Sequence, residues 1–354
     1  MTKNNNIKKR LPAEWEPQSA IQLTWPHGQT DWASCLDDIT KTFVELATVI
    51  ARFEPVLIVM PDEEHITRFR QQLPEKNILF AICPSNDTWA RDHAFITVEE
   101  QHGNERKKAF RLLDFQFNGW GEKFPAELDN AINARLYDKE LFNGTYENHL
   151  DFVLEGGSIE SDGKGTVFTT SQCLLAPHRN QPLNRIEIDK QLCERLGAER
   201  IVWLEHGNLI GDDTDGHIDT TVRCAPNNTL LYIRCDDAKD EHYEDFLWLE
   251  QQLKELRTID GKPYRLIPLP FPDAIFEEGE RLPATYANFL IVNGAVICPT
   301  YAQPKKDRMA LNAIKQAFPQ YEIIGIDART IVRQHGSIHC LTMQYPEGTI
   351  RNIH

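Results

Sequence analysis

The sequence has none of the long apolar segments that mark membrane or exported proteins. Its longest apolar runs, at 55–60, 78–82 and 289–292, are short and typical of buried strands. The start, MTKNNNIKKRLPAEWEPQSA, is polar and has neither the apolar stretch nor the cleavage site of an export signal. We therefore expect a cytoplasmic protein that does not enter a membrane.

Basic residues are also scarce. Lys and Arg number 38 against 53 Asp and Glu, which gives a formal charge of −15. Phosphate binding needs a basic face, so this balance argues against nucleic acid as the main partner, and against an anionic membrane surface. A cationic small molecule suits the charge better.

The eight cysteines are scattered, and no two of them form a C-x-x-C pair. This spacing excludes a zinc ribbon and offers no disulfide framework. We expect reduced thiols, as in cytosolic proteins, most of them inert core residues. At most one or two should carry chemistry.

Linkers and low-complexity runs are missing as well, so we expect one domain over residues 1–354. Helix-like and strand-like stretches alternate, which indicates the α/β class. The predicted helices are 34–52, 62–73, 125–136, 186–196, 240–257 and 305–317. The predicted strands are 55–60, 78–82, 110–115 and 201–204, together with several hairpins.

Five hairpin-like units recur along the chain, at 91–115, 157–170, 216–235, 286–301 and, more loosely, 336–345. In the fourth, Asn293-Gly294 predicts a type I′ turn. Successive polar residues at their starts lie 52 to 71 residues apart: Asp92, Glu155, His217, Asn288 and Cys340. This regularity suggests blades around an axis, with the polar residues at their starts meeting in one cavity. On spacing alone, an ordinary mixed sheet explains the pattern equally well.

The candidate reagents stand at the starts of these units: Asp92, Glu155, His217, Asp219 and Cys340. Cys340 is either a buried strand cysteine or a nucleophile, and a nucleophile needs a proton-handling partner such as His217. In a strand, His339 would point away from the thiol. His217 and Asp219 would share one face of a strand, against the plainer interpretation of a surface hairpin.

Two further acids have similar alternatives. Glu155 precedes two glycines, which is also what a tight turn requires. If the segment around Asp92 is extended, alternation places Asp92 opposite Trp89 and Arg91, unless the cluster is only a solvated salt-bridge patch.

Familiar catalytic and metal-binding motifs are absent. The chain lacks G-x-S-x-G, a Walker loop, G-x-G-x-x-G and an EF-hand register, which disfavours serine hydrolases, P-loop enzymes, nicotinamide dehydrogenases and a calcium loop. His335 and His339 are four apart, but Gly336-Ser337 between them argues against a helical metal site. The remaining candidates are one thiol, one imidazole and three carboxylates. Three acids suggest a cationic substrate with many N–H donors, and a guanidinium fits because it pairs with carboxylates through two parallel hydrogen bonds.

Six segments resemble the agmatine deiminase and bacterial peptidylarginine deiminase family of guanidino-group-modifying proteins: NDTWARDH, FNGWG, LEGGSIESDGKG, GHIDT, ATYANFLIVNG and GSIHC. They occur in the family's order over about residues 10–348. The resemblance implies a five-bladed α/β propeller of the pentein type, with pseudo-fivefold repeats. It also implies a hydrolase that turns a guanidine into a ureido group and releases ammonia, without a metal or organic cofactor.

The resemblance further implies residue roles. Cys340 matches the family nucleophile that forms a covalent amidino intermediate, and His217 the group that protonates the leaving ammonia and then activates water. Asp92 and Asp219 match the pair that holds the guanidinium. Glu155 matches the acid paired with the histidine. Trp89 matches an aromatic that packs on the substrate stem.

Two departures affect substrate choice more than reaction type. Asp92 is followed by HAFI instead of the family's usual x-G-P, and the last motif reads QHGSIHC instead of GGGNIHC. Conversion of agmatine to N-carbamoylputrescine is the first expectation, with arginyl peptides or another guanidino compound as the alternative. No obvious arginine pair can clamp a carboxylate, although Arg91 and Arg179 stay open for that role.

The expected partner is thus a small cationic guanidino substrate. Homo-oligomerisation is left open by the sequence. Two other classes compete with the deiminase: a metal-assisted hydrolase using His335, His339 and the acids of 212–219, and a catalytically silent binder of polyamines or guanidines.

Overall fold

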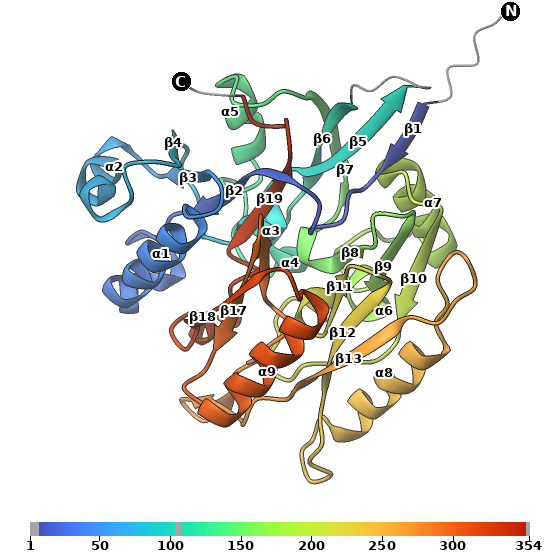
Figure 1. The fold of residues 1–354 in the computed structure, drawn as a ribbon. Helices are drawn as coiled ribbons and strands as arrows, with labels where there is room; N and C mark the ends of the chain where they lie inside the picture. Colours follow the sequence, from blue (N-terminus) through green and yellow to red (C-terminus); the bar gives the residue numbers. More distant parts are fainter. Residues whose placement is uncertain (1–6, 103–107, 352–354) are drawn as a thin grey trace, which may run out of the picture.

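The computed structural model describes residues 7–102 and 108–351 of the chain. Figure 1 shows five sheets placed around a common centre, with the longer helices on the outside. This arrangement is a five-bladed α/β propeller, as the family resemblance implied, and it excludes the ordinary mixed sheet that the repeat spacing left open.

Each sheet is built in the same way. Two antiparallel strands are followed by a helical crossover and a third strand that is parallel to the second. Parallel neighbours require such a crossover, because a short turn cannot bring the chain back in the same direction. The strands of the first four sheets are β5 (Ile96–His102), β6 (Lys108–Gln116) and β7 (Thr145–Val153); β8 (Ile159–Ser161), β9 (Thr166–Thr170) and β10 (Arg200–Leu204); β11 (Val222–Ala225), β12 (Thr229–Arg234) and β13 (Arg265–Pro270); β16 (Leu290–Val292), β17 (Ala295–Thr300) and β18 (Glu322–Asp327).

The fifth sheet joins the two ends of the described chain. Its first strand, β19 (Thr342–Pro346), pairs antiparallel with β2 (Gln18–Thr24), and β3 (Val56–Met60) and β4 (Ile78–Ile82) follow in parallel. This pairing closes the ring between the first and last units. Two smaller pieces complete the strands: β1 (Ile7–Arg10), which extends the β5 edge, and the hairpin of β14 (Phe276–Glu277) and β15 (Glu280–Arg281).

The crossover helices bury one stripe each. In α1 (Leu36–Ile50), Ile39, Phe43, Leu46 and Ile50 recur every three or four residues and are buried, the spacing that places side chains on one helical face. The other crossovers contain α4 (Gly119–Glu122), α5 (Ile132–Asp138), α6 (Ser171–Leu174), α7 (Arg185–Leu196), α8 (Tyr243–Glu255) and α9 (Pro304–Ala317). The crossover from β3 to β4 contains α2 (Glu63–Phe69), and α3 (Ala90–His93) precedes β5. The 3₁₀ turns are η1 (Asp31–Cys35), η2 (Arg70–Gln72), η3 (Gly156–Ser158), η4 (Ile218–Thr220) and η5 (Ile331–Gln334).

Most predicted elements are confirmed, with two local corrections. The predicted helix over 125–136 is wrong in its first half, because only Ile132–Asp138 is helical and turns precede it. The Asn293-Gly294 turn joins β16 to β17 as predicted, but it is not type I′: Gly294 has a positive φ of 83° and Asn293 does not.

Among the described residues, no helix is long and apolar enough to cross a membrane.

Candidate active site

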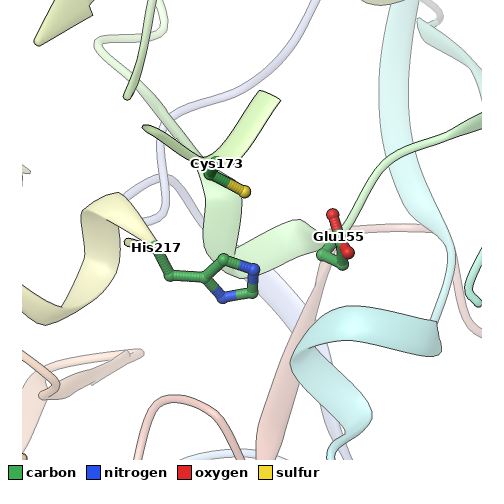
Figure 2. Close-up of side chains that lie close together, drawn as sticks. All are labelled: Glu155, Cys173 and His217. Carbon is green, nitrogen blue, oxygen red and sulfur yellow. The ribbon is translucent and has the colours of Figure 1, made fainter. Parts of the chain in front are cut away.

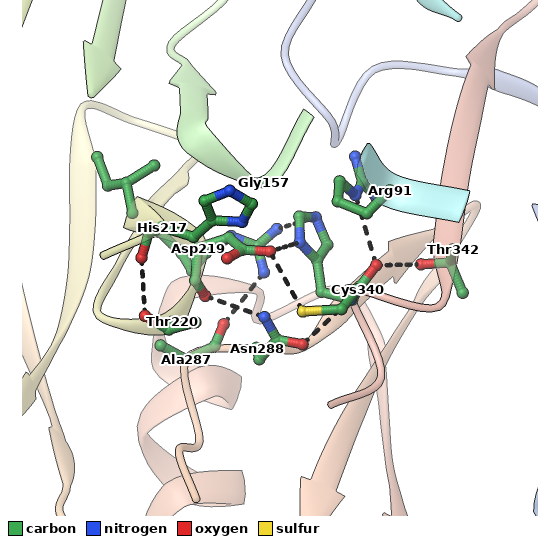
Figure 3. A network of polar contacts seen from close by, with 12 residues as sticks. Arg91, Gly157, His217, Asp219, Thr220, Ala287, Asn288, Cys340 and Thr342 are labelled. Atoms are coloured by element: carbon green, nitrogen blue, oxygen red, sulfur yellow. Dashed lines mark hydrogen bonds and ion pairs between the residues drawn. The ribbon is translucent and has the colours of Figure 1, made fainter. Parts of the chain in front are cut away.

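The segment that enters the first strand of each blade carries one of the predicted polar groups. Asp92 lies in α3 before β5, Glu155 before β8, His217 before β11, and Cys340 before β19. Asn288 occupies the same position before β16. Because the five blades surround one centre, these segments converge there, and hydrogen bonds join them across blades (Figure 3). The backbone N–H of Arg91 donates to the Cys340 carbonyl at 3.1 Å, and that of Gly157 donates to Asp92 Oδ1 at 3.0 Å.

Local conformation differs from the expectation in three places. His217 and Asp219 lie at the start of the 3₁₀ turn η4, not in a strand. The Asp92 segment is the short helix α3, so the alternation expected for an extended chain does not apply. His339 lies in a turn before β19 and points into the cluster. These short polar segments cap the blades, where no neighbouring strand keeps the backbone extended.

The Cys340 thiol is nearly buried, with 6% of the residue exposed. Its Sγ lies 3.9 Å from Asp219 Oδ2, and its backbone N–H donates to Asn288 Oδ1 at 3.2 Å. Burial raises the pKa of this thiol well above its ordinary value, and the Asp219 and Asp92 carboxylates raise it further. Burial and the two carboxylates therefore favour the neutral thiol in the free protein.

Asp219 is ionised despite its burial. Desolvation would raise its pKa, but the hydrogen bond from His339 Nδ1, at 2.7 Å, and the nearby positive charges bring the pKa below the ordinary value. Behind it, His339 Nε2 contacts Glu14 Oε1 at 2.9 Å, and Arg223 Nη2 donates to Glu14 Oε2 at 2.6 Å. Asp219 Oδ1 is buried and without a hydrogen-bond partner, so it is available to a bound cation.

His217 faces Asp92. Its Nδ1 lies 3.7 Å from Asp92 Oδ1, and both ring nitrogens are buried without a hydrogen-bond partner. Burial would lower the pKa of His217, but the Asp92 carboxylate, together with the neighbouring Cys173 side chain and the Glu155 carboxylate, outweighs burial and holds that pKa well above its ordinary value. Asp92 Oδ2 accepts a hydrogen bond from Trp120 Nε1 at 3.0 Å, which fixes the carboxylate.

Glu155 is fully buried, and only one of its two carboxylate oxygens has a hydrogen-bond partner. Its Oε1 accepts from Arg179 Nε at 2.8 Å, and its Oε2 has no partner. Arg179 also donates to Asp215 Oδ2 and to the Thr214 carbonyl, each at 3.0 Å. This guanidinium is therefore already engaged and does not line the Cys340 cavity. Arg91 does not line it either, because it pairs with Glu14 at 3.1 Å and borders a different cavity.

A cavity of about 470 Å³ ends at Cys340. Five of its lining residues are aspartates and, in the part of the chain that the structure describes, none is Lys or Arg. Its walls include Trp89 and Trp120, and Trp89 Nε1 donates to Asp87 Oδ2 at 2.9 Å. The lining residues are Asp31, Asp87, Trp89, Asp92, Trp120, Phe124, Asp212, Asp213, Thr214, Thr220, Gln334, His335, Gly336 and Cys340.

Four groups in or beside the site were not among the candidate residues of the sequence: Asn288, Trp120, Cys173 and Glu14. A fifth, His339, was considered there but expected to point away from the thiol. Asn288 and Trp120 belong to the quoted segments ATYANFLIVNG and FNGWG, so their position in those motifs was the available signal. His339 and Glu14 are 325 residues apart, and nothing in the sequence links them.

Two groups of described residues bring three metal-ligating side chains together: Glu155 with Cys173 and His217, and Glu14 with Glu160 and His339. The Arg223 guanidinium already occupies the second group, because it donates to both Glu14 and Glu160. Neither group contains His335 or an acid of 212–219. The metal-assisted hydrolase built on those residues therefore has no support among the described side chains.

The model of the Porphyromonas-type peptidyl-arginine deiminase family matches residues 10–346. The chain belongs to this family. It is 33% identical to the agmatine deiminase of Pseudomonas aeruginosa over 95% of both chains. A solved structure from Porphyromonas gingivalis, provisionally described as an arginine deiminase, is 50% identical with a TM-score of 0.90, over 97% of this chain and 100% of that one. A cysteine-to-serine variant of C. jejuni agmatine deiminase with substrate bound is 39% identical, with a TM-score of 0.89 over 98% of both chains.

Gly157 gives a direct test of this geometry. A Cβ at this position would lie 2.5 Å from His217 Nδ1 and 2.9 Å from Asp92 Oδ1. The added carbon would push the His217 ring and the Asp92 carboxylate away by a substantial fraction of an ångström. We therefore expect Gly157→Ala to lower kcat/KM about 100-fold or more. Steady-state kinetics and thermal unfolding check this. Gly28→Ala is the control, since nothing lies within 4 Å of its added carbon. Equal activity in both variants would contradict the site.

Proposed function

We propose that this chain is an agmatine deiminase, which hydrolyses agmatine to N-carbamoylputrescine and ammonia. The observation that carries the proposal is the cavity at Cys340, lined by five aspartates and by no Lys or Arg among the described residues. Agmatine has a guanidinium at one end and an ammonium at the other, and it has no carboxylate. An acidic cleft attracts such a dication and strengthens its binding.

In the proposed complex the guanidinium lies between the Asp92 and Asp219 carboxylates, with its carbon next to the Cys340 sulfur. Both acids are buried, and Asp219 keeps a free oxygen for a guanidinium N–H. The positive charge of the substrate offsets the two carboxylates that raise the pKa of Cys340 in the free protein. Substrate binding thus favours the thiolate at the moment when a nucleophile is needed.

The thiolate forms a bond to the guanidinium carbon, and the C–N bond to one terminal nitrogen breaks. His217, as imidazolium, gives that nitrogen the proton with which it leaves as ammonia. A covalent amidino-cysteine intermediate remains. Neutral His217 then takes a proton from water, the oxygen attacks the same carbon, and the thiolate leaves to yield the ureido product. In this scheme Glu155 stabilises the charged ring, and Trp89 packs on the methylene stem.

Substrate choice follows from charge. The α-carboxylate of free arginine, or of a C-terminal arginyl peptide, would enter the acidic cavity without a basic partner, since Arg91 and Arg179 do not line it. Like charges placed together cost several kcal/mol. We therefore place agmatine ahead of arginine, although the 50% identical structure is provisionally described as an arginine deiminase.

The test compares kcat/KM for ammonia release from agmatine, arginine and a C-terminal arginyl peptide. We expect agmatine to exceed both of the others by about 100-fold or more. The double variant Asp212→Asn/Asp213→Asn should narrow that gap, because it removes two cavity carboxylates. A rate with arginine or the peptide equal to or above that with agmatine would replace the proposal by the corresponding deiminase.

We further propose that residues 1–354 form a single catalytic domain, supported by the pairing of β19 with β2, which joins the two ends of the described chain in one sheet. The formal charge of −15 supports action on a small cation without a nucleic-acid partner, and the scattered cysteines, with no C-x-x-C pair, support a protein that acts in the cytoplasm. Mass measurement in solution tests whether it acts as a homo-oligomer.

A further inference from the structure

We propose that Glu155, Cys173 and His217 form an inhibitory binding site for a thiophilic divalent cation such as Zn²⁺. Figure 2 shows the Cys173 sulfur, the His217 imidazole and the Glu155 carboxylate at the three corners of a triangle. One ligand atom from each residue lies within 4.8 Å of the others. Thiolate, imidazole and carboxylate are the ligand types that zinc takes in proteins.

The three side chains are buried and keep free ligand atoms. The exposed fractions are 0% for Glu155 and Cys173 and 1% for His217. Glu155 Oε2 and both His217 ring nitrogens have no hydrogen-bond partner, and such orphaned buried atoms are uncommon. Arg179 engages only the other oxygen, Oε1. The Glu14, Glu160 and His339 group differs here, because its cation position is filled by Arg223.

To bind zinc, the ligand atoms of Glu155, Cys173 and His217 have to move about 1 Å closer to one another. Two ligand atoms of a tetrahedral zinc, each 2.0–2.3 Å from the metal, lie about 3.5 Å apart. Side-chain rotation of Cys173 and Glu155 can bring atoms within 4.8 Å to that separation. Glu155, Cys173 and His217 do not line the Cys340 cavity, but Asp92 does, and its Oδ1 lies 3.7 Å from His217 Nδ1. In the proposed complex the cation reaches the ring past this carboxylate. Water completes the coordination.

Binding exchanges protons for metal. The Cys173 S–H bond breaks and a Zn–S bond forms, with the proton released to solvent, and an imidazolium at His217 likewise loses one proton to become a ligand. A metal-bound ring nitrogen can no longer accept or return a proton. Zinc at this site therefore removes the acid and base of the proposed reaction while Cys340 stays free. This inhibitory consequence rests on the proposed function, whereas the binding itself does not.

The binding test uses the dialysed full chain. We expect one Zn²⁺ per chain by calorimetry, and a thiolate-to-metal charge-transfer band in the near ultraviolet with Co²⁺. Cys173→Ser should weaken zinc binding about 100-fold or more and remove the band. Cys340→Ser and the half-buried control Cys193→Ser should keep both the wild-type zinc affinity and the Co²⁺ charge-transfer band. Glu155→Gln, which retains the side-chain shape, should weaken binding about tenfold or more and serves if Cys173→Ser does not fold.

Absence of stoichiometric binding in the wild type would overturn the proposal, and so would a band that survives Cys173→Ser or disappears in Cys340→Ser. The second arm measures ammonia release. Zinc should inhibit the wild type, with recovery on chelation, and should inhibit Cys173→Ser about 100-fold more weakly relative to that variant's own rate. If zinc binds to the wild type and ammonia release is unchanged, the inhibitory role is overturned but the binding site is not. A chain inactive on every guanidino substrate would instead contradict the proposed function.

Discussion

Replacement of Cys340 by serine should lower kcat with agmatine about 10⁴-fold or more. A serine hydroxyl beside two carboxylates is a far weaker nucleophile than a thiolate, so the first covalent bond does not form. Substrate binding should survive, because Asp92 and Asp219 are unchanged. Ammonia release under saturating agmatine gives kcat, and calorimetry gives the Kd of the inactive complex.

Two measurements separate a nucleophile from a structural cysteine. Cys193→Ser, a change at a half-buried position in helix α7, should leave kcat within about twofold, because Cys193 does not line the cavity. Intact mass after an acid quench should show an amidino adduct on the wild type and none on Cys340→Ser. If Cys340→Ser keeps more than about one per cent of wild-type kcat, sulfur is not the attacking atom.

Replacement of His217 by glutamine should lower kcat about 10²- to 10⁴-fold, the usual contribution of one positioned acid and base. Glutamine fills a similar space but can neither protonate the leaving ammonia nor take a proton from water. The pKa of His217 is well above its ordinary value in the free protein, so the wild type starts near neutral pH as the acid that the first step needs. Rates from pH 6 to 9, with quenched mass spectra, show which step is slowed.

The matched control is His27→Gln. His27 is also buried, but it contacts Ser85 at 3.2 Å and does not line the Cys340 cavity. It should keep kcat within about tenfold, whatever its effect on thermal stability. A His217→Gln variant that retains kcat within tenfold of the wild type would remove His217 from the proton transfers and leave the water activation unexplained.

The repeat of one hairpin-and-helix unit was visible in the sequence, but its spacing left blades and an ordinary mixed sheet equally open, and the family resemblance decided for blades. A polar residue that enters an apolar hairpin is visible in the sequence, and five repeats at similar spacing place those residues at equivalent points. Asp92, Glu155, His217 and Cys340 were found in this way, and the structure places all four before the first strands of their blades. Their catalytic roles remain proposals.

Local backbone at these points was not predictable. His217 and Asp219 were expected on a strand and lie at a 3₁₀ turn, while the Asp92 segment is a short helix. Segments of three or four residues have weak intrinsic preferences, and contacts across blades decide their conformation. The same limit applies to Cys173, a cysteine with no distinctive neighbours in sequence that lies within 4.8 Å of His217 and Glu155.

The sequence by itself determined the reagents and their order along the chain: one thiol, one imidazole, three carboxylates, five repeats and a family. Only the tertiary structure decided their ionisation. Burial, together with the Asp219 and Asp92 carboxylates, raises the pKa of Cys340 and favours its neutral thiol. The pKa of Asp219 is lowered despite burial, because His339 donates a hydrogen bond to it and positive groups including Arg223 lie near it. Desolvation and Coulomb energies depend on burial and on separations of a few ångströms, and residues more than a hundred positions apart acquire those separations only in the folded chain.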